Sequence, residues 1–341
     1  MKIDTSLMFD PVTVGQMAAE LEAAGFDGAY SFEGQSDPFI TLTAAAMKTS
    51  KMTLMTSIAV AFARNPMSLA YLGNDLQLLS QGRFILGLGT QVKAHVERRF
   101  SMPWGKPVTR MRETVLAIKD IWRSWDTGEK LNFEGDYYQH TLMNPTFSPG
   151  PNPYGPPKIF MAGVGPKMTA AAAEVADGYF VHPFHSARSF DELSLPNIRS
   201  GLEQSGKRRD DFVISGQLIT ATGRNDEELE AAMLSARNQI AFYGSTPAYL
   251  PVLAVHGWED MQATWTALAR EGKWMEMAAS VTEDMLRAFA VVGTPEEVAA
   301  AIKVRCEGKM ERISPVIYKP DTELLIVLLK ALKAELVTED G

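Results

Sequence analysis

The sequence has almost no cysteine and no long apolar segment. Cys306 is the only cysteine among the 341 residues, so no disulfide can form within the chain, and we expect a reducing, cytoplasmic location. Met1 leads directly into a strand pattern, which argues against a signal peptide. The longest apolar run near the C-terminus, Leu324–Leu329, is far too short to span a bilayer. These features predict a soluble protein without a membrane partner.

Positive charge is also scarce. The chain carries 33 Lys and Arg against 41 Asp and Glu, a net charge of −8, and the acids are scattered. Proteins that bind nucleic acid usually show a basic surplus, so we expect no nucleic-acid partner. The sequence contains no GKS or GKT phosphate loop, no nucleophile elbow and no repeat. Hydrophobic residues make up 46% of the chain, which is enough for a large core.

The clearest structural unit lies in the first quarter of the chain. The apolar run Met52–Phe62 predicts a strand buried on both faces, and Phe84–Leu88 predicts another. Between them, Asn65-Pro66 predicts the start of a helix. Strand, helix and strand with short connections are typical of a βαβ unit with parallel strands. Such folds bind ligands at the carboxyl ends of their strands, which points to residues 57–62 and 87–95.

The same alternation extends over the whole chain. We count eight strands, each followed by a helix, which predicts one domain over residues 1–341 with a closed (β/α)8 TIM barrel; an open doubly wound sheet is the alternative. Insertions at about 126–157 and 243–290 follow strands 4 and 7, and the first contains a predicted hairpin at 130–140. Residues 91–106 are predicted to be a loop. The predicted strands are Ile3–Phe9, Gly28–Glu33, Met52–Phe62, Phe84–Leu88, Lys158–Ala162, Gly178–His182, Phe212–Ala221 and Arg312–Tyr318.

Two glycine pairs follow predicted strands. Gly163-Val164-Gly165-Pro166 combines glycines, which let the backbone approach an anion, with a proline that starts a helix whose free N–H groups attract negative charge. This turn is either a phosphate cradle or only a tight connection, and the spacing leaves both open. The full dinucleotide fingerprint is absent, because Met168 occupies its third glycine position. The spacing of Gly87-Leu88-Gly89-Thr90 favours a simple turn.

Several polar side chains are candidates for chemistry. Glu33 ends the second predicted strand, where a carboxylate can relay a proton, although a solvated or helix-capping acid fits the same pattern. His95 is either a proton donor beside a ring system or an ordinary loop histidine. His182 and His185 lack a third ligand at metal spacing, so we predict no metal site.

Five segments, in their order along the chain, carry a family likeness. They read AAGFDGAYSFE, TSIAVAFARNP, LSQGRFILGLGT, GVGP and FAVVGTPEEVAAAI. The sequence resembles the bacterial luciferase-like superfamily over nearly its whole length. Within that superfamily it is most similar to the oxidoreductases that depend on coenzyme F420, a deazaflavin. The combination of GRFxLGLGT with VGTPEEV is specific to this superfamily, whereas neither piece is specific alone.

The resemblance implies a (β/α)8 barrel with its cofactor at the carboxyl ends of the strands. It implies a non-prolyl cis peptide in the third strand, behind the middle ring of the cofactor, and a phosphate-binding turn after the fifth strand. The cofactor-binding residues expected on this basis are Ser57, Ile58, Val60, Gly89, Thr90, Gly163, Val164, Gly165 and Pro166, with the cis bond between Ser57 and Ile58. The expected substrate-facing residues are Phe62, Trp104 and His182.

One position departs from the family pattern. Several F420 enzymes carry an acid followed by a histidine after the second strand, but here Glu33 is followed by Gly34. This departure puts proton donation from Glu33 in doubt, and His95 is the substitute that we consider. The catalytic residues expected from the resemblance and the strand pattern are therefore Glu33 and His95.

Three functions are compatible with these observations. The first is an oxidoreductase that transfers a hydride between coenzyme F420 and a small organic substrate. The second is an FMN-dependent two-component monooxygenase, because both cofactors carry the same ribityl phosphate; a basic track of Lys93, Arg98 and Arg99 leading away from Gly163 would favour the acidic tail of F420. The third is a barrel that binds a flavin or deazaflavin without catalysis. Family members often form dimers through barrel helices, and the apolar helix Met67–Leu79 predicts a homodimer.

Overall fold

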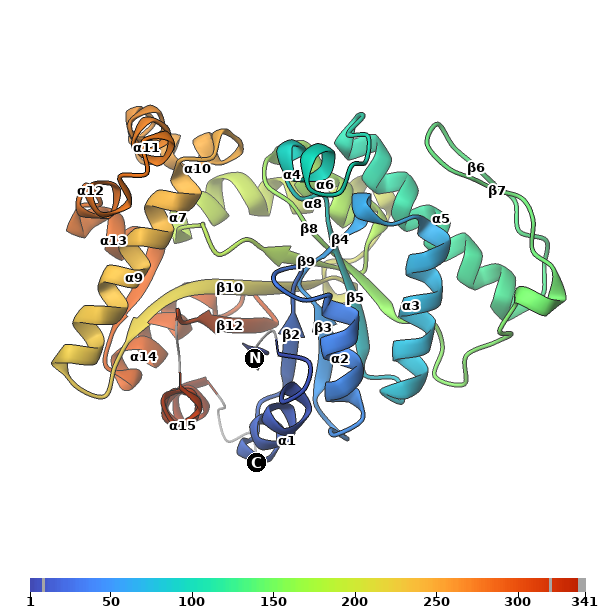
Figure 1. Cartoon of the computed structure of the whole chain (residues 1–341), viewed down its shortest axis with the longest axis horizontal. Helices are drawn as coiled ribbons and strands as arrows, with labels where there is room; N and C mark the ends of the chain where they lie inside the picture. The colour runs from blue at the N-terminus through green and yellow to red at the C-terminus, as the bar shows by residue number, and fades with distance from the viewer. Residues whose placement is uncertain (8–9, 319–320, 337–341) are drawn as a thin grey trace.

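Eight parallel strands form a closed ring at the centre of the chain (Figure 1). The computed structural model describes residues 1–7, 10–318 and 321–336. The ring closes because β10 pairs with β9 on one side and with β12 on the other, and β12 pairs with β1, so the predicted (β/α)8 barrel is confirmed and the open sheet is excluded. In ring order the strands are β1 (Lys2–Ser6), β2 (Gly28–Ser31), β3 (Thr53–Thr56), β5 (Phe84–Gly89), β8 (Lys158–Ala162), β9 (Gly178–Val181), β10 (Val213–Thr222) and β12 (Arg312–Val316). A short strand, β4 (Ala59–Val60), continues β3 alongside β5.

Helices surround the ring and follow its strands (Figure 1). Within the described ranges, none of them has both the length and the apolar character needed to cross a membrane. The helices are α1 (Val14–Ala24), α2 (Pro38–Ala46), α3 (Pro66–Leu79), α4 (Lys93–Arg98), α5 (Pro107–Thr127), α6 (Pro166–Val175), α7 (Ala187–Ser189), α8 (Leu195–Ser205), α9 (Asp226–Gly244), α10 (Leu250–Ala254), α11 (Asp260–Arg270), α12 (Trp274–Ala279), α13 (Glu283–Phe289), α14 (Pro295–Cys306) and α15 (Thr322–Leu336).

Local sequence explains where several helices begin. The side chain of Asp37 accepts a hydrogen bond from a first-turn amide of α2, and Asn65 does the same for α3. Thr294 and Glu297 form a reciprocal capping box at the start of α14. Each of these helices also has proline in its first turn, where the missing N–H costs nothing.

The interior of the ring is filled with side chains. Tyr30, Met55, Ile85, Phe160 and Phe180 form an apolar cluster inside it, separate from the larger core between strands and helices. Because both faces are covered, β2, β5 and β9 are buried at every residue. The ring is therefore a packed core and not a pore, so a ligand has to bind at one of its ends.

Some local predictions are confirmed and others need correction. The hairpin at 130–140 is present as β6 (Phe133–Glu134) and β7 (Gln139–His140). The expectation of a loop at 91–106 is wrong, because α4 lies there; a helix of six residues is too short to show a clear period. The last residue of the predicted second insertion and the three residues after it form β11 (Ala290–Gly293), a strand that was not predicted and that pairs in parallel with β10. The predicted first strand extends over residues 8 and 9, which lie outside the described residues.

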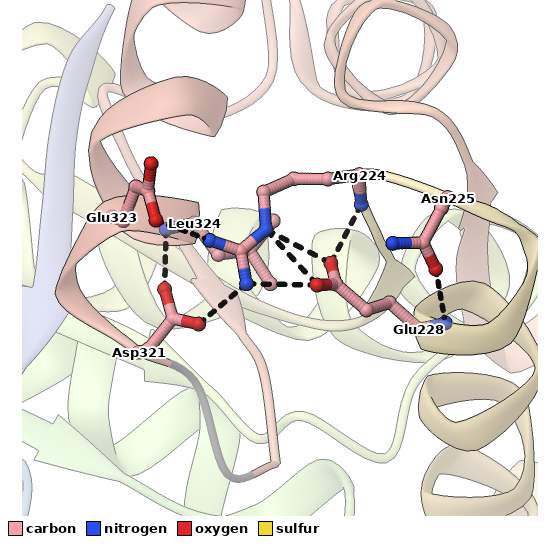
Figure 2. Close-up of polar contacts among 6 residues, drawn as sticks. All are labelled: Arg224, Asn225, Glu228, Asp321, Glu323 and Leu324. Carbon is pink, nitrogen blue, oxygen red and sulfur yellow. Dashed lines mark hydrogen bonds and ion pairs between the residues drawn. The ribbon is translucent and has the colours of Figure 1, made fainter.

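A cluster of charged side chains joins the last helix to the carboxyl rim of the ring (Figure 2). Arg224, just after β10, lies 2.8 Å from Glu228 on α9, 2.7 Å from Asp321 and 2.6 Å from Glu323 on α15. Asn225 caps α9 by accepting a hydrogen bond from the amide of Glu228. Exposed ion pairs contribute little individually, but this network connects the segments that follow β10 and β12.

Candidate functional site

The third ring strand is interrupted at the carboxyl rim. Between β3 and β4 the peptide bond linking Ser57 and Ile58 is cis, as the resemblance implies. The amide of Ser57 donates to the carbonyl of Ser31 on β2 at 2.8 Å, and the carbonyl of Ile58 accepts from the amide of Glu33 at 3.1 Å. The interruption is therefore hydrogen-bonded to the end of the neighbouring strand.

Two glycines let β5 lie directly against this interruption. A Cβ atom on Gly89 would lie 3.0 Å from Cγ1 of Ile58, and one on Gly87 would lie only 1.8 Å from the carbonyl oxygen of Thr56. The Thr56 hydroxyl bonds both the carbonyl and the amide of Gly87, at 2.7 Å each. Close packing of strands thus accounts for this glycine pair, without a phosphate.

One hydrogen bond crosses the mouth of the ring. Nε2 of Gln217 on β10 donates to Oγ of Ser57 at 2.9 Å, although β10 and β3 lie on opposite sides of the ring. Ile58 and Ala162 are partly buried and pack on the inner apolar cluster. The floor of the mouth is therefore apolar, with a single amide–hydroxyl pair across it.

Glu33 is bound to the segment that follows β4. Its carboxylate accepts hydrogen bonds from both Nη atoms of Arg64, at 2.6 and 3.0 Å, and from the amide of Val60 at 3.0 Å. Arg64 also lies 2.6 Å from Asp37. The side chains of Glu33 and Arg64 are only 9% and 13% exposed. Both carboxylate oxygens are already used by the protein, which fits a role in positioning this segment better than a role in proton donation.

The glycine turn follows β8 and leads into α6. Gly165 has φ 88° and ψ 155°, a conformation essentially reserved for glycine, and a Cβ there would meet no atom within 4 Å. A Cβ on Gly163 would lie 2.3 Å from Cγ of Met168. The first amides of α6 have no acceptor within the helix, and no side chain caps them. The turn therefore offers open space and free N–H groups, the two properties that anion binding needs.

A pocket lies beside this turn. The turn forms one wall, and β9, the π-helical segment η3 (Phe190–Ser194) and α10 contribute to the others. The hydroxyl of Tyr179 on β9 donates to the carbonyl of Gly163. Burial raises the pKa of Tyr179 to about 12, so this hydroxyl keeps its proton and holds the turn in place.

Both ring nitrogens of His182, directly after β9, have partners. Nδ1 accepts from the amide of Phe184 at 3.1 Å, so the proton of the neutral ring is on Nε2, which lies 3.0 Å from the hydroxyl of Tyr249. Burial lowers the pKa of His182 to about 3, which keeps the ring neutral. The rings of His182 and Tyr249 also stack, with centroids 4.7 Å apart. The Tyr249 hydroxyl still has its own proton to donate, so it is better placed than His182 to bind a polar substrate atom.

His185 lines the same pocket and is 4% exposed. Its Nδ1 lies 2.9 Å from the carbonyl oxygen of His182. Burial, with a smaller effect from the charge of Arg305, lowers the pKa of His185 to about 3. The folded protein therefore holds this ring neutral well below the range in which an exposed histidine takes up a proton.

The other predicted contact residues lie at the same rim with different exposure. Phe62 is completely buried, and its ring packs edge-on against the partly exposed ring of Trp104, with the ring centroids 5.6 Å apart. Of this pair, only Trp104 can therefore contact a ligand. His95 is exposed on α4. The hydroxyl of Thr90 donates to the carbonyl of Gln91 at 2.8 Å.

Two of the basic residues at α4 have partners in the structure. Lys93 lies 3.8 Å from Glu97 on the same helix, and Arg99 donates to the carbonyl of Gly34, after β2, at 3.0 Å. In the ring, β3 and β5 separate β2 from β8. Arg99 is therefore held toward β2, whereas Gly163 follows β8.

Sequence reasoning missed the partners of several predicted residues. Arg64 lies within the ARNP segment, and a signal for it was available, because an arginine directly after an apolar strand needs a counter-charge. Gln217 is the largest polar side chain in a mostly apolar strand pattern, which is unusual enough to mark a functional position. Tyr249 lies in the second insertion, and no pattern there connects it with His182.

A family profile, related sequences and a solved structure all relate this chain to luciferase-like proteins and reductases. The sequence profile described as luciferase-like monooxygenase matches residues 4–310. An uncharacterized protein of Mycobacterium tuberculosis is 47% identical over 330 residues, which cover 97% of each chain. A 5,10-methylenetetrahydromethanopterin reductase of Archaeoglobus fulgidus is 31% identical over 90% of each chain. The structure of a coenzyme F420-dependent tetrahydromethanopterin reductase from Methanopyrus kandleri has a TM-score of 0.80, with 22% identity over 96% of both chains, and so supports the fold.

Replacing Glu33 with alanine tests the positioning role. The variant leaves Asp37 as the only acidic partner of Arg64 among the described residues and leaves the Val60 amide without its acceptor, so we expect the free energy of unfolding to fall by about 2–3 kcal/mol in urea denaturation. Glu97→Ala removes an exposed ion pair of α4 and serves as the control, with a change within about 0.5 kcal/mol. Equal stability of Glu33→Ala and the wild type would contradict the positioning role.

The pH dependence of stability tests the neutral state of His185. The unfolded chain binds a proton near pH 6.5 but the folded protein only near pH 3, so acidification through this window favours unfolding. We expect His185 to contribute a slope of up to about 1.4 kcal/mol per pH unit, measured by urea denaturation at a series of pH values. His185→Asn should flatten the profile between pH 6 and pH 4, and a profile that is unchanged by this substitution would contradict the neutral state of the ring.

Proposed function

The chain belongs to the luciferase-like monooxygenase family, and from this premise we propose that it is an oxidoreductase that transfers a hydride between coenzyme F420 and a small organic substrate. One observation carries the proposal. The interruption between β3 and β4 and the glycine turn after β8 lie at the same rim of the ring. The A. fulgidus relative is named as a reductase, which supports the choice of a reductase, and the M. kandleri structure is named as an F420-dependent reductase, which supports the choice of F420.

The residues at the rim fit such a cofactor. The space that a Cβ of Gly165 would enter is open, and the free amides of α6 suit a phosphate. Ile58 and Ala162 provide an apolar surface on which a planar ring can lie, and Gln217 provides an amide beside it. F420, when bound, supplies or accepts the hydride. The protein's part is to bind the phosphate, orient the ring and keep water away from it.

Individual side chains receive different roles in this proposal. Glu33, through Arg64 and Val60, positions the backbone beside the ring. Tyr249 donates a hydrogen bond to a polar atom of the substrate, with His182 fixing its orientation and Trp104 adding an apolar wall. His95 is kept as the proposed proton donor, because its exposed position on α4 allows proton exchange with solvent.

Two further expectations belong to the same proposal. The first is a cytoplasmic homodimer formed through α3, on which the apolar side chains of Leu78 and Leu79 are exposed. The second concerns the alternative cofactor. FMN carries the same ribityl phosphate, and the matching profile is named for monooxygenases, so an FMN-dependent monooxygenase is the competing function.

Titration with F420 and with FMN tests the proposal. We expect F420 to quench the fluorescence of the six tryptophans and to bind at least about tenfold more tightly than FMN, a difference of about 1.4 kcal/mol. If the purified protein contains FMN and does not bind F420, the F420 assignment is refuted. The protein with bound, reduced F420 is also mixed with aldehydes, ketones and enones. If it binds F420 but reduces none of these compounds, the proposed hydride transfer is refuted and only the binding function remains.

Substitution of Gly165 tests the glycine turn as the phosphate site. Alanine cannot adopt the backbone angles of Gly165 without strain, so the turn has to move, and we expect F420 affinity to fall about 5- to 100-fold. Gly206→Ala is the matched control, because Gly206 has φ 68° and equally open surroundings but follows α8. The control should lose a comparable amount of stability and keep its affinity; equal affinities of the two variants would contradict the assignment.

A further inference from the structure

A second cavity lies at the amino end of the ring, opposite the glycine turn. It has a volume of about 410 Å³, and its lining includes the first residue of each of β1, β3, β5, β8, β10 and β12. Ile85 and Phe160 of the inner apolar cluster also line it, so this cluster lies between the cavity and the carboxyl rim. Cavities of this size are typical of small-molecule sites, so the amino end has room for a ligand of its own.

The alternation of side chains along a strand turns several lining residues toward the axis of the ring. Residues two positions apart share one face of a strand. Lys158 lies two positions before Phe160, and Arg83 lies two positions before Ile85, both of which belong to the inner cluster. The side chains of Lys158 and Arg83 therefore start on the inner face, at the end of the ring.

Glycine occupies the same layer in two strands. Gly28 begins β2 and Gly178 begins β9, each two positions before a residue of the inner cluster. A Cβ on Gly28 would lie 2.4 Å from Oδ1 of Asp4, and one on Gly178 would lie 2.5 Å from Cε1 of Phe160. Asp4 is therefore on the inner face of β1, as is Lys2, two positions earlier. Because β2 and β9 contribute no side chain here, this end of the ring keeps open space.

Positive charge surrounds the cavity, although the whole chain has a net charge of −8. The charged residues of its lining are one acid and four bases: Glu311, Lys2, Arg83, Lys158 and Arg312. Arg312 forms a buried ion pair with Asp4, and Glu311 lies 2.8 Å from Arg209. These two pairs leave three basic side chains to determine the charge of the cavity.

The remaining bases are Lys2, Arg83 and Lys158, and within the described ranges none of them lies within ion-pair distance of a carboxylate. The guanidinium of Arg83 is fixed by the carbonyls of Thr49 and Met52, to which it donates at 2.8 and 2.5 Å. Lys2 and Lys158 are exposed, so their ammonium groups are free to move toward a ligand. Three uncompensated positive charges around one cavity attract anions, and multiply charged anions most strongly.

The end of the first insertion gives the cavity a wall. Tyr154 and Pro156 belong to its lining. The carbonyl of Gly155 accepts a hydrogen bond from Nε2 of Gln77, on α3, at 3.3 Å. Tyr154 packs on Gly82, where an added Cβ would lie 3.3 Å from the Cβ of Tyr154. The insertion is therefore attached beside the barrel end and encloses the cavity on one side.

We propose that this cavity binds an oxyanion ligand with two or more negative charges, either a phosphorylated small molecule or a polycarboxylate. The ammonium groups of Lys2 and Lys158 contact it, and Arg83 adds a fixed charge. The inner cluster separates this ligand from the carboxyl rim, so it is neither the substrate nor the cofactor of the proposed function. Since the cavity is formed by the starts of six ring strands, the ligand binds only the closed ring and stabilises it.

Isothermal titration calorimetry with pyrophosphate and with citrate tests the proposal. We expect at least one of them to bind the wild type with a dissociation constant of about 1 mM or tighter, and the double variant Lys2→Gln/Lys158→Gln to bind it about 5- to 100-fold more weakly. A preference for pyrophosphate identifies a phosphorylated ligand, and a preference for citrate identifies a polycarboxylate.

Two further double variants are controls. Lys48→Gln/Lys330→Gln removes the same charge from exposed lysines outside the cavity and should bind within about twofold of the wild type. Lys2→Arg/Lys158→Arg keeps both charges and should bind within about threefold. Urea denaturation checks that each variant folds, and Lys158→Gln alone replaces the double glutamine variant if the latter does not.

The outcomes separate this inference from the proposed function. If the wild type binds neither probe, or if Lys2→Gln/Lys158→Gln binds as tightly as Lys48→Gln/Lys330→Gln, the inference is overturned. Binding that is lost in Gly165→Ala but kept in Lys2→Gln/Lys158→Gln places the anion at the glycine turn and also overturns it. F420 affinity is measured separately and should be the same in Lys2→Gln/Lys158→Gln and the wild type. Failure of the wild type to bind F420 refutes the proposed function and leaves this inference intact.

Discussion

The shared direction of the eight ring strands is the constraint on which the site depends. Because all of them run in parallel around a closed ring, their carboxyl ends form one rim. Four features that are far apart in the sequence lie together at this rim: the interruption after β3, the glycines of β5, the turn after β8 and the histidines after β9. The apolar cluster inside the ring gives this rim a solid floor, so a bound ring system would rest on packed side chains.

Charge is distributed unevenly around this rim. On the side of β2 and β3, Glu33 and Arg64 neutralise each other while fixing the backbone. On the side of β9, burial keeps His182 and His185 neutral, so each presents a fixed pattern of donor and acceptor. The amino end of α6 lies between these regions in ring order and offers free amides. Such an arrangement suits a ligand with an uncharged ring at one end and an anionic group at the other.

Much of the fold could be predicted from the sequence, because the apolar periods of strands and helices and the helix caps are local properties. Gly163 and Gly165 were also recognisable, since the turn between a strand and a helix is a local pattern. The partners within the site were not, because contacts such as Gln217 with Ser57 join residues 160 positions apart and depend on the closure of the ring. Short elements such as α4 and β11 contain too few residues to show a period.

Closure of the ring has a consequence for the synthesis of the protein. Asp4 on β1 and Arg312 on β12 form a buried ion pair, although 308 positions separate them. While the ribosome is still adding the middle of the chain, β1 has β2 as a neighbour but lacks β12. The nascent protein therefore has an open sheet edge and an unpaired acid until translation is nearly finished, and chaperones that shield exposed edges would act in this interval.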